Sequence, residues 1–460
     1  MVRCYIMSTL TGEQESRLIE SEEELYRFFQ PFAKPVAERR IGLEWEIFGV
    51  ERETGKGLFY LGPRGIEAIL CRLAAAFHYE PILEEGHVIA LKRGGDWVTL
   101  EPGGQVELSA SPVKTVFEIE NQLKTFAGEL KEVGKNYFPG MTWLSVGMHP
   151  FSSLDEISWV PKRRYALMAS YLKSKGALAH DMMKRTATNQ LNLDFPDEAT
   201  ALAQLRTVFG ITSIVSALFA NSSFSEGKPN GFLTRRVQIW NETDPARTGL
   251  LRELIQEGTS FRDYIEYLLD MPMIFIVRGE KWIPMEGISF RKFLREGKTG
   301  ERATWPDFEL HLSTAFPEAR FKHYLEIRGV DAQRFPFIPA VAAFWKGILY
   351  DDQSRQASWQ LVKDFSPEER LKLHSALPKE GLKARFGRVP IFELAEELVR
   401  LSCEGLRRQA MDSQRSEEVY LESIREEILK PRRSPAETLL KKWSEEFGQD
   451  SHALIRYLEI

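Results

Sequence analysis

Hydrophobic and polar residues alternate along several short stretches of the chain, and this two-residue period predicts β-strands. The predicted strands cover residues 40–50, 87–92, 97–100, 105–109, 141–146 and 187–195. Elsewhere apolar residues recur every three or four positions, which is the period of an amphipathic helix. This period predicts helices over 64–77, 118–133 and 200–221, followed by a Gly/Pro-rich loop over 225–231.

Both ends of the chain are charged and have helical patterns. Residues 1–34 are predicted to be helical, with Ser21 and Glu24 spaced as a capping box. From about residue 354 the sequence is amphipathic with little strand signal. This order of elements predicts an α+β fold, a mostly antiparallel sheet with helices outside it. No linker interrupts the pattern, so we interpret 1–460 as a single catalytic domain. Its part from 354 to 460 is predicted to be mostly helical.

Composition restricts the class of protein. The 460 residues are 43% hydrophobic and 28% charged, with a formal net charge of -5, which is typical of a globular protein with a large core. The mildly acidic balance argues against nucleic acid as the main partner. We expect no apolar run to reach the roughly 20 residues that span a bilayer, so no membrane partner is predicted. The N-terminus lacks a signal-peptide layout, which predicts a cytoplasmic location.

The cysteines carry little chemistry. Cys4, Cys71 and Cys403 lie far apart and form no CxxC pair, so we expect neither a zinc site nor a disulfide framework. Cys71 falls inside the predicted helix 64–77, where we expect it to be buried and to pack as a small hydrophobic residue.

The acidic residues are more informative because they interrupt apolar strands. Glu44 and Glu46 flank Trp45, and side chains two residues apart in a strand point to the same face. Two like charges on one face are unfavourable without a cation beside them. Glu101 and Glu107 bracket a Pro-Gly-Gly turn between two strand-like segments. A solvated strand face would give the same pattern for any one of these pairs.

Glu326 and Arg328 repeat the two-residue spacing near the end of the patterned region. Carboxylate oxygens are the natural ligands of Mg²⁺, which is usually shared with nucleotide phosphates. A set of such acids projecting from one sheet therefore predicts a Mg²⁺ site with several ions for ATP. Arg328 could then meet the terminal phosphate, since a guanidinium suits bidentate phosphate recognition.

Other charged residues leave alternatives open. Arg236 lies in an apolar, strand-like segment and needs an anionic partner, which could be a substrate carboxylate or a structural glutamate. Lys228 is expected to be a solvated loop lysine. His149 is more often a hydrogen-bonded structural residue in such a setting, and the same holds for His78, His180 and His323. No Walker A, GxGxxG or G-x-S-x-G motif occurs in the chain.

At these residues the chain resembles the plant and proteobacterial type of glutamate–cysteine ligase. Gly42-Leu-Glu-Trp-Glu-Ile-Phe-Gly49 is similar to that family's G-T-E-H-E-K-F-G stretch, and Leu100-Glu-Pro-Gly-Gly-Gln-Val-Glu-Leu-Ser109 is nearly its L-E-P-G-G-Q-x-E-L-S signature. Further matches follow in order along the chain, at 185–195, 226–232, 243–249, 316–320, 324–329 and 434–440.

The resemblance implies a glutamine synthetase-like fold, with an antiparallel sheet curved into a funnel that holds Mg²⁺ and ATP. It implies ligation of the glutamate γ-carboxylate, through an acyl phosphate, to the amino group of cysteine, the first step of glutathione biosynthesis. The implied metal-site acids are Glu44, Glu46, Glu101, Glu107 and Glu326. Gln190 and Asn192 are implied near the nucleotide or metal, and Arg328 at the phosphate as the catalytic residue. Arg236, with Trp240 nearby, is implied to hold the glutamate.

The chain departs from the family pattern at several positions. Met148-His149 stand where Phe-Gln is common, Ile274 stands where an aromatic residue is common, and Ala187 replaces a Cys. The first two changes fall where the acceptor amino acid is expected, so Met148, His149 and Ile274 are predicted acceptor-site residues. A γ-glutamyl ligase for another amine is therefore the first alternative. A phosphotransferase of the same broad fold and a non-catalytic binding protein are the others, and small molecules are the expected partners.

Overall fold

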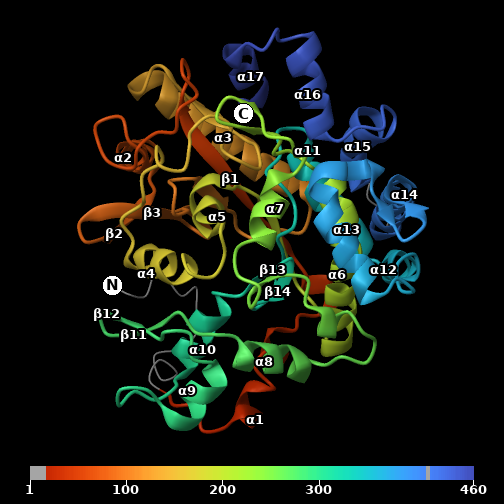
Figure 1. The fold of residues 1–460 in the computed structure, drawn as a ribbon. Coiled ribbons are helices and arrows are strands. Elements are labelled where there is room, and N and C mark those ends of the chain that lie inside the picture. Colours follow the sequence, from red (N-terminus) through yellow and green to blue (C-terminus); the bar gives the residue numbers. More distant parts are fainter. Residues whose placement is uncertain (1–16, 411–414) are drawn as a thin grey trace.

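The computed structural model describes residues 17–410 and 415–460 (Figure 1). Cys4 and the first part of the predicted N-terminal helix lie outside the described residues. The centre of the fold is a nine-stranded sheet in which every pairing is antiparallel. Its order is β14 (Ala319–Phe321), β15 (Leu325–Ile327), β7 (Asn189–Leu193), β1 (Ile41–Glu51), β5 (Val106–Ser109), β4 (Asp96–Leu100), β3 (His87–Arg93) and β2 (Glu80–Glu84).

The long strand β1 organises this sheet. Its first half pairs with β5 on one side and β7 on the other, and its last four residues pair with β6 (Met141–Leu144). The edge strands β14 and β2 do not pair with each other in the described residues, so the sheet is open rather than a closed barrel. The predicted α+β class with an antiparallel sheet is confirmed, although β2 and β14 were not predicted.

Helices surround the sheet. Those at 66–77, 116–137 and 198–218 match predicted helices, whereas those at 163–172 and 179–185 were not predicted. The helices before the C-terminal part are α1 (Glu22–Leu25), α2 (Ile66–Phe77), α3 (Val116–Tyr137), α4 (Arg163–Leu172), α5 (Ala179–Arg185), α6 (Glu198–Leu218), α7 (Arg235–Asn241), α8 (Phe261–Asp270), α9 (Phe290–Glu296), α10 (Trp305–Leu312) and α11 (Phe337–Leu349). Short two-strand ribbons join them, namely β8 (Phe224–Ser225) with β9 (Lys228–Pro229), β10 (Thr248–Gly249) with β13 (Phe316–Pro317), and β11 (Phe275–Arg278) with β12 (Lys281–Pro284).

The C-terminal part is dominated by helices, shown in blue in Figure 1. They are α12 (Asp352–Gln360), α13 (Pro367–Glu380), α14 (Ile391–Gln409), α15 (Glu422–Ile424), α16 (Pro435–Glu445) and α17 (Ser451–Leu458). The two-residue strands β16 (Arg385–Phe386) and β17 (Val389–Pro390) form a small ribbon among them. That 1–460 forms a single domain with this helical part stays a prediction.

The core lies on one face of the sheet. Trp45 of β1 is fully buried, and its ring meets Phe126 of α3 edge-on with 6.4 Å between ring centroids. Helix α11, which is buried over its whole length, contacts β1 and β7. Because side chains alternate across a strand, the neighbours of Trp45 in β1 point to the opposite face. The chain thus buries its aromatic residues on one side and presents acids on the other.

Helix α6 corrects the expectation about apolar length. It is 21 residues long and apolar enough, by length and composition, to cross a membrane. However, 89% of its most apolar window is buried inside the fold, which is the property of a core helix. Its contacts with β14, β15 and the C-terminal helices α12, α13 and α14 account for that burial.

Two local predictions were wrong. Cys71 lies in α2 as expected but is exposed, because the buried stripe of that helix runs through Ile66, Ile69, Leu70 and Leu73.

At the N-terminus α1 spans only four residues, and the Ser21 side chain forms no cap. Glu24 instead accepts hydrogen bonds from the backbone N–H of Glu20 at 3.0 Å and from Arg17 at 2.6 Å, so the capping box is absent at this helix.

Candidate active site

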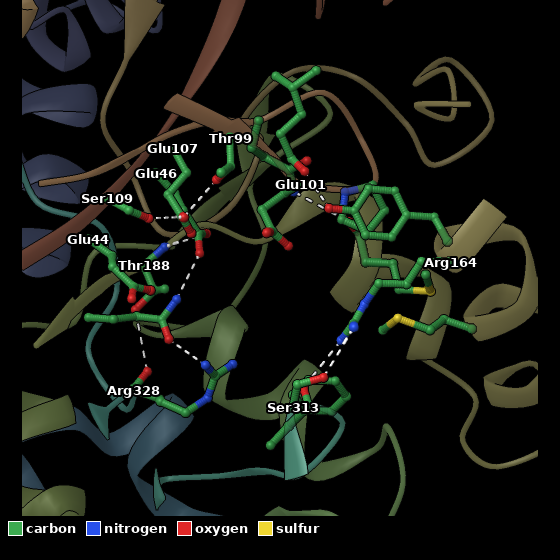
Figure 2. Close-up of a pocket in the computed structure, with 18 of the residues that line it drawn as sticks. Glu44, Glu46, Thr99, Glu101, Glu107, Ser109, Arg164, Thr188, Ser313 and Arg328 are labelled. Atoms are coloured by element: carbon green, nitrogen blue, oxygen red, sulfur yellow. Dashed lines mark hydrogen bonds between the residues drawn. The ribbon is translucent and has the colours of Figure 1, made fainter. Parts of the chain in front are cut away.

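The sheet face opposite α3 and α11 opens into a cavity of about 490 Å³. Its walls come from strands β1 to β5 and β7, from helices α4, α5 and α7, and from the segment 309–328. Figure 2 shows carboxylates, hydroxyls and arginines that point into this space from different elements. Residues far apart in the sequence therefore meet around one volume of the size that binds small molecules.

Strand register brings the predicted acids together. Glu46 of β1 stands directly opposite Glu107 of β5, and Glu44 stands opposite Gln190 of β7. The Glu46 carboxylate accepts hydrogen bonds from the backbone N–H of Thr188 at 3.0 Å and from Gln190 Nε2 at 3.2 Å. Like charges directly opposite one another destabilise a sheet, so this arrangement needs a compensating reason.

Neutral donors orient the other two strand acids as well. Glu107 Oε1 accepts from the hydroxyls of Thr99 at 2.8 Å and Ser109 at 2.6 Å, which lie on β4 and β5. Glu44 Oε1 accepts from Asn192 Nδ2 at 2.9 Å. Each carboxylate is thereby held at one oxygen, and these bonds fix its direction without neutralising its charge.

Burial and mutual repulsion raise the pKa of these acids. Burial, then the charges of Glu107 and Glu326, raise the pKa of Glu44 to about 7. Burial, followed by Glu101 and Glu107, raises the pKa of Glu46 well above its usual value. Burial raises the pKa of Glu107, with Glu101 adding to the effect, and also that of Glu101 itself. These carboxylates therefore resist ionising together unless positive charge is added to the cavity.

The donor set fits a hard divalent cation. Glu44, Glu46, Glu101 and Glu107 all line the cavity and offer oxygen ligands, which Mg²⁺ prefers. Between 17 and 410 and between 415 and 460, no group of three or more His, Cys, Asp or Glu side chains is already drawn close enough to hold an ion. Ligation by this set therefore requires the carboxylates to rotate, and the hydrogen bonds described above hold Glu44 and Glu107 at one oxygen only.

Glu326 differs from the other predicted metal acids because cations already surround it. Its carboxylate is fully buried and forms ion pairs with Arg320, with Lys322 at 2.6 Å and with Arg328 at 2.9 Å. Burial alone would raise the pKa of Glu326, but these three cations hold it well below its usual value. In β15 it stands opposite Asn192 of β7, beside the acids. Ligation of a metal by Glu326 would require at least one cation to turn away.

Arg328 projects into the cavity just after β15. Its Nη1 donates to Gln190 Oε1 and to Glu326 Oε2. The guanidinium lies 5.6 Å from the centroid of the Trp240 ring and 5.7 Å from that of Phe316. This predicted phosphate-facing residue is therefore fixed between the acid cluster and two aromatic rings, where it can stabilise developing negative charge.

Arg236 lies in helix α7, so its predicted strand setting was wrong. The guanidinium is buried, lines the cavity and donates from Nη2 to the carbonyl oxygen of Arg328 at 2.8 Å. In the described part of the chain, no carboxylate lies within salt-bridge distance of it, and burial lowers its pKa. Trp240 follows one helical turn later and also lines the cavity. The charges of Asp331, Glu318 and Glu46 nevertheless favour the protonated form of that guanidinium, and its role in holding a substrate carboxylate stays a prediction.

Sequence reasoning missed a second arginine of the same kind. Arg164, near the start of α4, is half-buried, lines the cavity and donates to Ser313 Oγ at 3.1 Å and to its carbonyl at 3.3 Å. Figure 2 shows it on the other side of the cavity from Glu44 and Glu46. It stands in the basic run Lys162-Arg-Arg164, which reads as an ordinary helix start, so no sequence signal distinguishes it from exposed Arg163.

The predicted acceptor-site residues do not line this cavity. Met148 and Ile274 are buried in the hydrophobic core. His149 is also buried, meets the ring of Phe48 edge-on at 5.0 Å, and accepts from the backbone N–H of Ser152 at 3.0 Å. Their assignment followed from a resemblance rather than from local chemistry, and their role at the acceptor site stays a prediction.

The remaining predicted residues have separate positions. Asn192 lies behind Glu44 and is not among the cavity-lining residues, whereas Gln190 is. His323 lines the cavity and stacks on Phe32 with 3.9 Å between ring centroids. Lys228 is exposed in β9, as expected of a loop lysine.

Comparison with known proteins identifies the family. The family model described as glutamate–cysteine ligase family 2 matches residues 40–454. The chain belongs to this family. Among curated relatives, the glutamate–cysteine ligase of Arabidopsis thaliana is 38% identical over 433 residues, which covers 93% of this chain and 81% of the relative. Ligase B of Oryza sativa subsp. japonica is 39% identical over 431 residues, covering 92% and 85%. The predicted family and the predicted ligase class are confirmed, and the family's reaction is the first step of glutathione synthesis.

Solved structures show a similar fold in proteins of much lower sequence identity. A glutamate–cysteine ligase from Francisella tularensis, solved in complex with AMP, has a TM-score of 0.56 at 12% identity, covering 92% of this chain and 87% of that one. A bifunctional glutathione synthetase from Pasteurella multocida has a TM-score of 0.54 at 12% identity, covering 94% of this chain and 54% of that one. At such identity the likeness concerns the fold alone.

The predicted cytoplasmic location is contradicted by the curated relatives. The Arabidopsis thaliana, Oryza sativa and Brassica juncea ligases are all named as chloroplastic enzymes. The prediction followed from the absence of a secretory layout near the N-terminus, which is no guide to import into an organelle.

Proposed function

We propose that the ligase uses ATP to activate the γ-carboxylate of glutamate and joins it to the amino group of cysteine. The observation that carries this proposal is the meeting, in one cavity, of four buried or half-buried acids of raised pKa with two arginines, buried Arg236 and half-buried Arg164, that form no ion pair in the described residues. Acids suit cations bound to a triphosphate, and the arginines suit anionic groups of the substrates.

The metal and nucleotide assignments are part of this proposal. Glu44, Glu46, Glu101 and Glu107 would hold Mg²⁺, which supplies positive charge that screens the triphosphate and the γ-carboxylate from each other. Gln190 would orient the site, since its amide donates to Glu46 while its oxygen accepts from Arg328. Asn192 would do the same for Glu44 from behind it.

The first chemical step is phosphoryl transfer to a carboxylate. An oxygen of the glutamate γ-carboxylate attacks the γ-phosphorus of ATP, the bond from that phosphorus to the bridging oxygen breaks, and ADP leaves. Arg328 would face the transferred group and offset the negative charge that both reactants carry. Its tether to Glu326 and Gln190 keeps the guanidinium in place, so little reorganisation is needed during the step.

The second step forms the amide. The acceptor nitrogen attacks the acyl carbon, loses a proton and expels phosphate. Arg236, beside Trp240, would hold the glutamate α-carboxylate throughout, and this fixes the distance from the γ-carboxylate to Arg328. Arg164 offers a further, half-buried cation on the other wall for an anionic group of a substrate.

Water must be kept from the acyl phosphate, because hydrolysis would waste it. The Gly-rich segment 226–231 is the proposed lid. Gly227 donates its N–H to the carbonyl of Pro150 at 2.9 Å, and Glu226 lies 3.5 Å from Arg185. At its other end Asn230 donates from its backbone N–H to the carbonyl of Ser223 at 2.9 Å and from Nδ2 to that of Ser222 at 3.0 Å. A moving lid would therefore break its contacts with Pro150 and Arg185 and turn near Asn230.

Cysteine is the proposed acceptor, and another amine is the first rival. The departures that favoured the rival, Met148, His149 and Ile274, lie outside the cavity lining, which weakens that argument. The deciding experiment measures ADP release from the purified protein with ATP, glutamate and each of a panel of amino acids and amines. We expect cysteine to give the highest kcat/KM, and a preference for a non-thiol amine would overturn the cysteine assignment.

The same assay tests the phosphotransferase alternative. Analysis of products by mass spectrometry should reveal an amide and one free phosphate for each ADP formed. A stable phosphorylated substrate, with no amide, would instead assign the protein to the kinase class.

A further inference from the structure

Asp331 is a buried acid that does not line the cavity but is bonded to the segment that precedes Arg236. It is 1% exposed. Its Oδ2 accepts from the backbone N–H of Asn221 and from Ser222 Oγ, both at 2.7 Å, and its Oδ1 accepts from Thr234 Oγ1 at 3.0 Å. Burying a carboxylate that is bound only by neutral donors costs free energy. We therefore expect the position of the loop that it holds to matter for function.

Two of those donors continue to the start of helix α7. Thr234 is the N-cap residue, and its Oγ1 accepts from the backbone N–H of Val237 at 3.4 Å. Ser222 Oγ accepts from the backbone N–H of Arg236 at 3.1 Å. Asp331 therefore reaches the first turn of α7 by two routes, and the second ends on Arg236 itself. Since α7 carries both Arg236 and Trp240, its first turn sets where these side chains enter the cavity.

On its other side Asp331 is fixed to the acid cluster. It forms an isolated antiparallel bridge with Thr188, whose N–H donates to Glu46 at 3.0 Å. Gly147 backs onto the carboxylate so closely that a Cβ there would lie 2.5 Å from Asp331 Cγ. The backbone of Asp331 thus lies beside Thr188 and the Glu46 region, while its carboxylate, packed against Gly147, bonds towards the first turn of α7.

We propose that Asp331 is a positioning residue for glutamate binding, which sets the place of Arg236 relative to Glu46. The inference rests on the proposed role of Arg236 in holding the glutamate α-carboxylate. Asp331 touches no substrate in this scheme. It acts by fixing the span between the group that holds one end of glutamate and the acids beside which the other end reacts.

The experiment compares steady-state kinetics of the Asp331→Asn and Thr234→Val variants with the wild type. Asn cannot accept at its nitrogen, and Val removes the hydroxyl while keeping the shape. We expect KM for glutamate to rise about tenfold in each, as the loss of one or two buried hydrogen bonds implies, with kcat and KM for ATP changed less than about threefold. Thr234→Ser should restore the wild-type KM.

A matched cap on another helix separates positioning from stability. Thr115 is the N-cap residue of α3, where its hydroxyl accepts from Glu118 N–H at 3.2 Å, and α3 does not line the cavity. Thr115→Val should lower the Tm while KM for glutamate stays at the wild-type value. Equal changes in KM for Thr115→Val and Thr234→Val would overturn the inference.

A double-mutant cycle with Arg236→Met distinguishes this inference from the proposed function. If Arg236→Met leaves KM for glutamate unchanged, the proposed role of Arg236 fails. If Arg236→Met raises KM but Thr234→Val does not, or if the two effects simply multiply, the positioning role of Asp331 fails. In the Arg236→Met background we expect Thr234→Val to raise KM for glutamate by less than about twofold, because the cap acts through Arg236.

Discussion

Glu46 and Glu107 stand directly opposite each other in the β1–β5 pairing, and their side chains are 6% and 7% exposed. Such a pair destabilises the protein on its own, because each charge raises the cost of ionising the other. Cations that enter the cavity with a nucleotide would offset the repulsion within the cluster that this pair forms with Glu44 and Glu101.

Replacing one acid of this pair should abolish turnover and stabilise the metal-free protein. Glu46→Gln or Glu107→Gln is expected to lower kcat by at least about 10²-fold, as removal of a group that organises transition-state charge does. In EDTA at pH 8 the free energy of unfolding of the same variants should be about 1 kcal/mol higher than that of the wild type, because the repulsion between the two acids is removed. Thermal denaturation measures the second effect.

Glu129 provides the control for these variants. It is a buried glutamate on α3 that accepts from Tyr79 and Arg93, both at 2.7 Å, and lies away from the cavity. Glu129→Gln should lower the Tm and leave kcat of the folded enzyme unchanged. A wild-type kcat in Glu107→Gln would show that the acids are not used in catalysis.

The stability of the metal-free protein should depend on pH through Glu44. Burial raises its pKa from 4.5 to about 7, so the folded state binds a proton more tightly than the unfolded state. Its contribution is fully present below pH 4.5 and is lost as pH rises through 7, on the order of 3 kcal/mol in all. Urea denaturation in EDTA from pH 5 to 8 measures this fall. Saturating Mg²⁺ with ATP should reduce it, and a metal-free stability that increases over this range would contradict the prediction.

Arg328→Lys should separate chemistry from binding. A lysine keeps the charge but cannot span Gln190 and Glu326 in the same way, so the group that faces phosphate loses its fixed direction. We expect kcat to fall by about 10²-fold, while KM for glutamate changes by less than about threefold. Arg278→Lys, at an ion pair with Asp307 outside the cavity, is the matched control and should keep kcat.

Isotope transfer tests the acyl phosphate. When the γ-carboxylate of glutamate carries ¹⁸O in both oxygens, one ¹⁸O should appear in each phosphate released and one should remain in the amide. Mass spectrometry of both products measures the label. Phosphate without ¹⁸O would mean that the γ-carboxylate never attacked phosphorus.

How far the sequence predicted this site differs from one residue to another. The i, i+2 spacing placed Glu44 and Glu46 on one face because a strand has a fixed period of two. The pairing of Glu46 with Glu107 depends on register between separate strands, which no local pattern specifies. Glu326 was assigned to the site on its two-residue spacing with Arg328, whereas Gln190 was assigned only through the resemblance.

The wrong predictions have local causes. The segment around Arg236 is a short apolar run, which periodicity cannot assign to helix or strand, and the Thr234 cap decides for a helix. Cys71 was placed inside a real helix but on its exposed side. Arg164 was missed because a basic residue at a helix start has no distinguishing pattern until the opposite wall of the cavity is known.

The most direct test of the account is Mn²⁺ binding, measured by electron paramagnetic resonance with a non-hydrolysable ATP analogue present. Mn²⁺ takes the oxygen ligands that suit Mg²⁺. The wild type should bind Mn²⁺ and analogue together, and Glu46→Gln and Glu107→Gln should weaken Mn²⁺ binding at least about tenfold, whereas Glu129→Gln should not. Equal Mn²⁺ affinity in all four proteins would contradict the claim that these buried acids bind cations beside the triphosphate.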